Sequence, residues 1–166
     1  MSTARFARGI CRQETGDNKM AEEAFTAGVL HDIGKLMLAA NLPQEFKDAA
    51  RQSHEKKITL ATSERQALGA THAEIGGCVL GIWGLPAAIV TAIAFHHRPD
   101  QHATKNFSPL TAVHVANALE HELNPDKDDP TPEQVDRYYL EELGLQNRVE
   151  AWREGCRALS ESSDRN

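Results

Sequence analysis

The most constraining feature of this chain is a stretch of 21 uncharged residues from Ile75 to Phe95. A helix of about 20 apolar residues is long enough to cross a lipid bilayer. Here, however, Gly84-Leu85-Pro86 interrupts the stretch in its middle, and His96 and His97 follow it at once. Because glycine and proline end helices, the stretch predicts two short buried helices joined by a turn, and we expect no membrane partner.

The rest of the chain also predicts helices. Apolar side chains recur at helical spacing, nine residues are aromatic, and no useful run alternates as a strand does. Thr71 and Glu74 form a capping box, and Thr131-Pro132 resembles a second helix start. We therefore expect one compact all-α domain of about eight or nine helices. The predicted helices cover about residues 3–14, 20–40, 43–53, 60–68, 72–83, 86–97, 109–122, 132–143 and 145–160.

Charge and cysteine content exclude several classes of protein. Eighteen basic and 24 acidic residues give a net charge of −6, whereas binding nucleic acid requires a positive surface. We therefore expect no nucleic-acid partner. Cys11, Cys78 and Cys156 are far apart and form no CxxC pair, which indicates reduced thiols in a cytoplasmic protein. Residues 1–20 are polar and contain three arginines, so we expect no secretory signal.

A histidine and an aspartate, His31 and Asp32, interrupt an otherwise apolar predicted helix. Burying an ionised carboxylate without a partner costs several kcal/mol, so Asp32 must have one. One interpretation is a hydrogen bond between the two side chains that orients two helices. The other is a divalent metal ion bound by an imidazole nitrogen and a carboxylate oxygen. Lys35 is predicted on the same face as His31, where it would suit a phosphate, and Gly28 and Gly34 would let another helix approach closely.

Three further histidines lie in apolar sequence. His72 is in the first turn of a predicted helix, and His96 and His97 end another. A single buried histidine is usually structural, but several embedded in apolar sequence favour a shared metal site. Because buried polar groups must find partners, we expect these residues to converge on one pocket with His31 and Asp32. The remaining histidines are predicted to be solvated, with the environment of His114 the least defined. They are His54, His102, His114 and His121.

Several strings of this sequence together resemble the HDOD family, the HD-related output domains of bacterial signalling proteins. The HD signature corresponds to Ala24 to Leu36, and the later strings are Glu64 to Gly69, His72 to Gly76, Trp83 to Pro86 and Ala92 to His97. The resemblance runs from about residue 2 to residue 122 and implies a compact HD-type helical domain in a bacterial cytoplasm. We therefore assign residues 1–122 to an HDOD-like core, 123–161 to a C-terminal helical extension packed on it, and 162–166 to a frayed tail.

The resemblance also implies a set of metal ligands, because the HD superfamily contains metal-dependent phosphohydrolases. The residues at matching positions are His31, Asp32, His72, His96 and His97. Two ligand positions are lost. No histidine precedes His31, and the position of the final aspartate matches Asn117, which keeps an oxygen but loses its charge. Arg98-Pro99 follows His97 where cyclic-di-GMP phosphodiesterases carry a GYP motif, which argues against that activity.

Two functions follow from the resemblance. The first is a degenerate HD domain that binds a protein partner or ligand without turnover, with one divalent metal (Zn, Fe, Ni or Mn) or none. The alternative is a metal-dependent phosphohydrolase, in which Asp32 orients the attacking water and Lys35 steadies the phosphate.

The family domain has a further helical part before the matched region. We therefore expect an uncovered face. The stripe Phe6, Ile10 and Cys11 would then pack in a homodimer.

Overall fold

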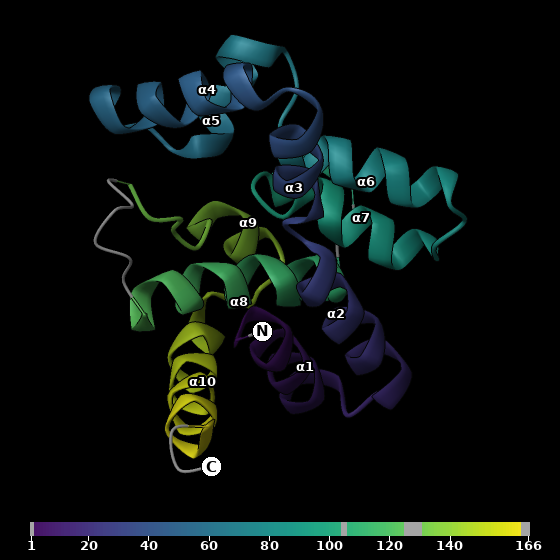
Figure 1. Cartoon of the computed structure of the whole chain (residues 1–166). Helices are drawn as coiled ribbons and strands as arrows, with labels where there is room; N and C mark the ends of the chain where they lie inside the picture. Colours follow the sequence, from purple (N-terminus) through teal and green to yellow (C-terminus); the bar gives the residue numbers. More distant parts are fainter. Residues whose placement is uncertain (1, 104–105, 125–130, 164–166) are drawn as a thin grey trace.

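The computed structural model describes residues 2–103, 106–124 and 131–163, and within these ranges every regular element is helical (Figure 1). The all-α prediction is confirmed. The α-helices are α1 (Ser2–Thr15), α2 (Asn18–Leu30), α3 (Ile33–Asn41), α4 (Pro43–Lys56), α5 (Leu60–Leu68), α6 (His72–Ile82), α7 (Ala87–Phe95), α8 (Pro109–Leu123), α9 (Arg137–Glu142) and α10 (Val149–Ser163). Two short 3-10 helices, Pro99–Gln101 and Gln146–Arg148, complete the described part.

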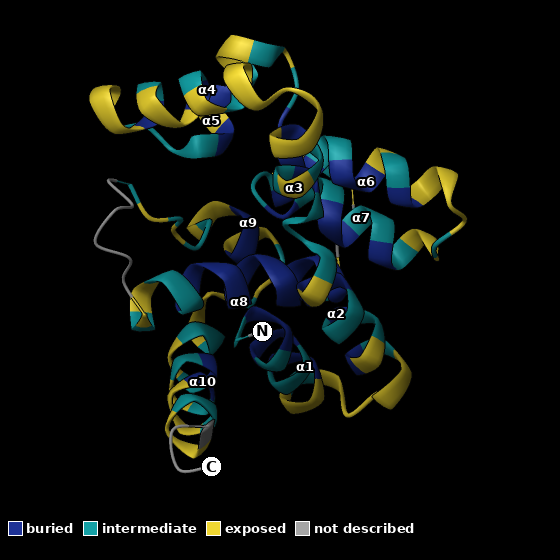
Figure 2. Ribbon diagram, viewed as in Figure 1, coloured by how far each residue is buried: buried dark blue, intermediate teal, exposed yellow. Residues whose placement is uncertain are grey.

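Helix α8 forms the centre of the core. Every residue from Pro109 to Leu119 is buried, and α1, α2, α7 and α10 pack around it (Figure 2). A helix that is apolar on all sides is stable only when it is surrounded in this way. The first helix lies directly on α8, and the C-terminal α10 covers both.

The apolar stripe of α1 is covered within the chain, contrary to our expectation. The side chains of Phe6, Ile10 and Cys11 are buried where α1 packs on α2, α8 and α10. Trp152 of α10 is fully buried, and its indole nitrogen donates a hydrogen bond to Glu14. The stripe therefore offers no free apolar face for a second copy of the chain.

The uncharged stretch forms two short helices, as predicted. The turn between α6 and α7 depends on Gly84, whose φ of 82° lies in the left-handed region that glycine adopts readily. The helices pack closely, because a Cβ atom on Gly77 would lie 2.6 Å from the Cβ atom of Ala94. Within the described residues, no helix is both long enough and apolar enough to cross a membrane.

The predicted helix 20–40 is wrong in one respect, because it is broken at His31 and Asp32. The His31 ring hydrogen-bonds the carbonyl of Gly28, which a continuous helix would pair with the amide of Asp32. The chain then turns so that α3 meets α6, with Gly34 directly against the carbonyl of His72. This break explains why the described residues contain ten α-helices where about eight or nine were expected.

The predicted start of the helix near Thr131 is also wrong. Residues 132–136 are not helical, and α9 begins only at Arg137. The cap is Asp136, whose side chain accepts a hydrogen bond from the amide of Tyr139. In this non-helical segment, Glu133 and Asp136 contact histidines of the core.

Candidate metal centre

The five side chains that the sequence singled out come from three places in the fold. His31 and Asp32 lie in the break between α2 and α3. His72 is the first residue of α6, where Thr71 caps the helix through the predicted capping box. His96 and His97 directly follow the last residue of α7.

The structure brings these five side chains together, and we call them the histidine pocket. Their contacts are His72 Nε2 to His97 Nε2 at 2.8 Å, Asp32 Oδ1 to His72 Nε2 at 3.3 Å, Asp32 Oδ2 to His31 Nε2 at 3.4 Å, and ring centroids 5.2 Å apart for His31 and His96. One nitrogen each from His72, His96 and His97 lies within 4.8 Å of the others, so these three could hold a metal ion. Whether the five residues bind a metal ion stays a prediction.

A glycine makes this convergence possible. A Cβ atom on Gly34 would lie 1.9 Å from the carbonyl oxygen of His72, which is far inside van der Waals contact. Only glycine therefore lets the start of α3 approach the start of α6 closely enough for Asp32 to reach the His72 ring. The predicted roles of Gly34 and Gly28 in close approach are both confirmed, since a Cβ atom on Gly28 would lie 2.6 Å from the backbone of Ala4.

In all four pocket histidines, the Nδ1 atom faces an acceptor outside the pocket. The contacts are His31 with the Gly28 carbonyl at 2.8 Å, His72 with Glu64 Oε2 at 2.7 Å, His96 with the Ile93 carbonyl at 2.8 Å, and His97 with Glu133 Oε1 at 2.9 Å. A carbonyl or carboxylate can only accept, so the hydrogen bonds of His31, His72 and His96 favour a proton on Nδ1. The contact of His97 with Glu133 is close but is not aligned as a hydrogen bond. In His31, His72 and His96 the Nε2 atom is therefore the one left for a metal ion, which is the arrangement of metal-binding histidines.

Burial controls the charge of the pocket. Burial lowers the pKa of His96 and of His97 well below its usual value, because a charged ring would lose its hydration. Burial lowers the pKa of His31 too, and the nearby Asp32 opposes this only in part. These three rings are therefore neutral at neutral pH, as ligation requires.

The other two pocket groups behave differently. Burial would lower the pKa of His72, but its contacts with Asp32 and Glu64 outweigh burial and raise it. Burial would raise the pKa of Asp32, but its contacts with His72, His31 and Lys35 hold it far below the usual range. The pocket thus contains one firmly ionised carboxylate, and His72 keeps a proton that a metal ion would displace.

Three buried atoms of the pocket are without a hydrogen bond to any described residue. One is Nδ1 of His97, which lies 2.9 Å from Glu133 Oε1 but is not aligned with it as a hydrogen bond. The other two are Nε2 of His96, whose side chain is 1% exposed, and Oδ1 of Asp32. An unsatisfied polar atom in a protein interior costs about 1–3 kcal/mol. Because His96 Nε2 and Asp32 Oδ1 are both electron-pair donors, a cation would satisfy them together, and the donor set therefore fits a metal ion.

One side of the pocket is open to solvent. The Asp32 side chain is 40% exposed, and the ammonium of Lys35 lies 2.9 Å from Asp32 Oδ2. Lys35 is thus placed beside the pocket and not within it. An anion that approached the pocket from this side would meet the Lys35 ammonium first.

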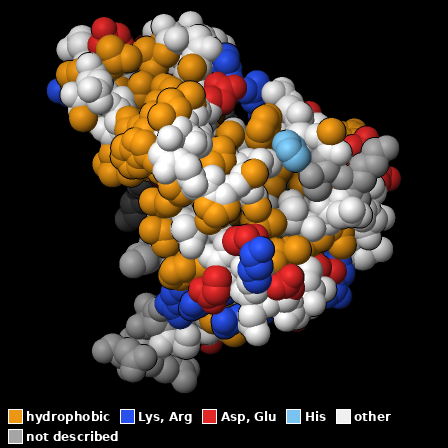
Figure 3. Space-filling model, turned by 90° about the vertical axis from the view of Figure 1, so that its right-hand side faces the viewer, with side chains coloured by type: hydrophobic (Ala, Val, Ile, Leu, Met, Phe, Trp, Pro, Cys, Tyr) orange, Lys and Arg blue, Asp and Glu red, His pale blue; other side chains and the backbone are white. Residues whose placement is uncertain are grey.

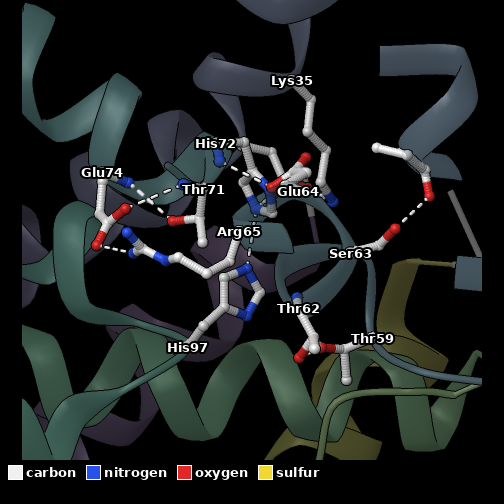
Figure 4. Close-up of polar contacts among 12 residues, drawn as sticks. Lys35, Thr59, Thr62, Ser63, Glu64, Arg65, Thr71, His72, Glu74 and His97 are labelled. Carbon is white, nitrogen blue, oxygen red and sulfur yellow. Dashed lines mark hydrogen bonds and ion pairs between the residues drawn. The ribbon is translucent and has the colours of Figure 1, made fainter. Parts of the chain in front are cut away.

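Sequence reasoning missed two carboxylates that support the pocket. Glu64 of α5 is fully buried, and one of its oxygens accepts hydrogen bonds from both the amide and the ring of His72 (Figure 4). Glu133 lies in the segment that was predicted to be helical. The sequence signal for Glu64 was its place in a string shared with the HDOD family, and Glu133 had none.

The remaining predicted positions have clear outcomes. The prediction of a solvated His114 is wrong, because it is buried and its Nδ1 donates to the carbonyl of His96. Asn117 is buried on α8, and in the described part of the chain no hydrogen bond or ion pair connects it to the histidine pocket. Its role as a lost ligand position stays a prediction. Glu74, which is near the pocket in sequence, pairs instead with Arg65 and Arg98.

We expect the free energy of unfolding of the metal-free protein to fall as the pH is lowered below about 6.5. The pKa values of His31, His96, His97 and His114 are lowered by burial in the folded state. The unfolded chain therefore binds protons that the folded chain does not. Each such group costs up to about 1.4 kcal/mol of stability per pH unit below its unfolded pKa of about 6.5. The raised pKa values of His72 and Glu133 have the opposite sign, but they are two groups against four.

Urea unfolding at pH 7.5, 6.5 and 5.5 in the presence of a chelator measures this effect. A variant of the exposed His54, His54→Asn, is the control and should show the same pH dependence as the wild type. Stability that is unchanged or rises towards pH 5.5 would contradict the buried, neutral state of these four histidines.

The arrangement matches known proteins in sequence and in fold. The family model of the HDOD domain matches residues 1–99. A protein of Treponema pallidum (strain Nichols), described as uncharacterized, is 29% identical over 111 residues, which are 67% of this chain and 21% of that protein.

Two solved structures resemble the whole described fold. A Geobacter sulfurreducens HDOD domain protein aligns with a TM-score of 0.75 and 23% identity, covering 99% of this chain and 57% of that chain. A Shewanella amazonensis protein, provisionally named a phosphohydrolase, aligns with a TM-score of 0.70 and 20% identity, covering 95% and 56%. This chain therefore spans little more than half of those structures and about a fifth of the Treponema protein.

Proposed function

Since this chain belongs to the HDOD domain family, we propose that it is a signalling module that holds one divalent metal ion in the histidine pocket and binds a partner without turnover. The observation that carries the proposal is the convergence of His72, His96 and His97, whose ring nitrogens lie within 4.8 Å of one another, with Asp32 in contact with the rings of His31 and His72. A pocket of this composition is organised for a cation before any cation binds.

The charge of the pocket favours one ion over two. Asp32 is the single carboxylate among the five groups, and neutral histidines add no charge. Glu64 and Glu133 face Nδ1 atoms and are therefore supports rather than ligands. One divalent ion with one carboxylate leaves a charge of +1, whereas two ions would leave +3 in a largely buried site.

The ligand types indicate which metals suit the pocket. Imidazole nitrogen binds zinc, iron and nickel well, whereas sites for magnesium and calcium are rich in oxygen. We therefore propose zinc, iron or nickel first, with manganese less well matched. Such an ion would supply a Lewis acid, while the chain's own residues fix its position: His31 and Asp32 from one side, and His72, His96 and His97 from the other.

The binding of a protein partner is supported by exposed apolar side chains. Ile82 and Trp83, where α6 ends, are 78% and 69% exposed, and Leu36 of α3 is 67% exposed. On the side of the molecule where α6 ends, hydrophobic side chains gather over much of the surface (Figure 3). Exposed apolar surface of this kind is typical of interaction sites. A cytoplasmic location and a homodimer are also part of the proposal, although the buried stripe of α1 no longer supports a dimer.

A second function, phosphate-ester hydrolysis, is favoured by one observation. Asp32 and Lys35 lie together on the open side of the pocket, where an ammonium would attract a phosphate group. In this version Asp32 would orient a water molecule and Lys35 would steady the phosphate. Hydrolysis is the less favoured function because the pocket has only one carboxylate and because Asn117, which is uncharged, matches the position of the final aspartate of the superfamily.

We expect the purified protein to show no multiple-turnover hydrolysis of cyclic-di-GMP with added manganese or iron. Only one carboxylate is present for metal binding, and Arg98-Pro99 follows His97. Chromatographic analysis of the products over many enzyme equivalents measures this. Sustained cleavage that is lost in Asp32→Ala but kept in Asp48→Ala would contradict binding without turnover and support the phosphohydrolase function.

A further inference from the structure

A segment beyond the residues matched by the family model reaches the histidine pocket. Residues 131–136 form a non-helical segment, and two of them contact the core histidines. An oxygen of Glu133 lies 2.9 Å from Nδ1 of His97, and the amide of Asp136 donates to Nε2 of His114 at 2.9 Å.

The second contact fixes the backbone beside the pocket. Because Nε2 of His114 accepts a proton from the amide of Asp136, the ring proton of His114 is on Nδ1. That Nδ1 donates to the carbonyl of His96 at 2.7 Å. The segment thus holds the peptide group between His96 and His97, the two adjacent predicted ligands.

The contact between Glu133 and His97 is distinctive, because the Nδ1 atom of His97 has a different kind of partner from the Nδ1 atoms of His31 and His96. Nδ1 of His31 and of His96 faces a backbone carbonyl one turn earlier in its own helix. His97 has no such carbonyl among the described contacts, and the acceptor within reach of its Nδ1 is Glu133 Oε1, at 2.9 Å but not aligned as a hydrogen bond. The group that can set the orientation and tautomer of the His97 ring is thus a side chain 36 positions further along the chain.

Glu133 is well placed for this role. Its side chain is 20% exposed. Glu133 also lines a cavity of about 940 Å³, whose other lining residues include members of α8, α9 and α10. Burial raises the pKa of Glu133, while the nearby histidines and Lys35 lower it in part. Burying an ionised carboxylate has a cost, and these nearby groups offset only part of it.

We infer that Glu133 is a positioning residue of the histidine pocket, which holds His97 with its proton on Nδ1 and so sets the affinity of the pocket for its metal ion. The inference rests on the proposed function. It adds that the C-terminal segment, and not the matched region alone, completes the site. Removing a supporting partner of a ligating histidine typically costs 10–100-fold in metal affinity.

Competition between the protein and a chromophoric chelator for Zn²⁺ tests the inference. Glu133→Ala is expected to weaken zinc binding by about 10–100-fold. Glu133→Gln keeps an oxygen that can accept from Nδ1 and should lose less. Glu141→Ala is the control, because Glu141 lines the same cavity without contacting the pocket and should bind zinc as the wild type does.

Nitrogen-15 NMR of the metal-free proteins gives an independent readout. In the wild type, the Nδ1 resonance of His97 should have the shift of a protonated nitrogen, and in Glu133→Ala it should move towards a mixture of tautomers. Equal zinc affinity and an unchanged His97 resonance in Glu133→Ala would overturn the inference and leave the proposed function standing. A wild type that binds no zinc, with the NMR change still present, would overturn the proposed function and its affinity clause but support the positioning of His97.

Discussion

Replacing the carboxylate of the histidine pocket by Asp32→Ala is expected to weaken zinc binding about 100-fold or more. Asp32 is the one charged ligand candidate, and it lies within 3.4 Å of Nε2 atoms from two different helices. A supporting residue already accounts for 10–100-fold, so loss of a charged ligand should cost at least the upper end of that range. Isothermal titration of metal-free protein with Zn²⁺ measures the change.

Asp48→Ala is the matched control for this experiment. Asp48 is a carboxylate of α4 that pairs with Arg51 on the surface, so the variant removes the same charge away from the pocket. It should bind zinc as tightly as the wild type. If Asp32→Ala binds zinc with unchanged affinity, the pocket described above is not the metal site.

Gly34→Ala is expected to destabilise the fold by about 1–3 kcal/mol and to weaken metal binding as well. The added Cβ atom would meet the carbonyl oxygen, carbon and Cα of His72 at 1.9, 2.7 and 3.0 Å. All three are backbone atoms, which cannot rotate away as a side chain can. Helices α3 and α6 must therefore separate, at a cost typical of overpacking, and Asp32 must move away from His72.

Gly81→Ala is the control, because it adds the same methyl group to α6 where the nearest atom is 3.6 Å away. Alanine is favoured over glycine in a helix by about 1 kcal/mol, so this variant should be as stable as the wild type or slightly more stable. Urea unfolding of both variants gives the comparison. Gly34→Ala with wild-type stability and wild-type zinc affinity would contradict the close approach of α3 and α6.

Most of the fold could be predicted because its signals are local. The capping box at Thr71 and the turn at Gly84 are visible in the sequence, and both helices of the uncharged stretch follow from them. The break at His31 and Asp32 could not be predicted in this way. It depends on the packing of Gly34 against His72, two positions that are distant in sequence, and the N-cap residue of α3, Asp32, makes no side-chain capping hydrogen bond.

The same distinction applies to the histidine pocket. Its five members were found from the sequence because polar residues are conspicuous in apolar helices. Their supports were not found, because Glu64 and Glu133 occur in polar sequence and become buried only through tertiary packing. The prediction for His114 was wrong for a related reason. Its side chain becomes buried only through the packing of α8 and of the segment at Asp136.

The metal content of the protein tests the central claim most directly. The full chain would be purified without chelator, loaded with Zn²⁺, exposed to mild chelation and analysed by mass spectrometry of the elements. The histidine pocket, with four imidazoles that are neutral when they bind a metal ion and one carboxylate, predicts one equivalent of metal per chain, lost in Asp32→Ala. Two equivalents that survive chelation, or none at all, would contradict it.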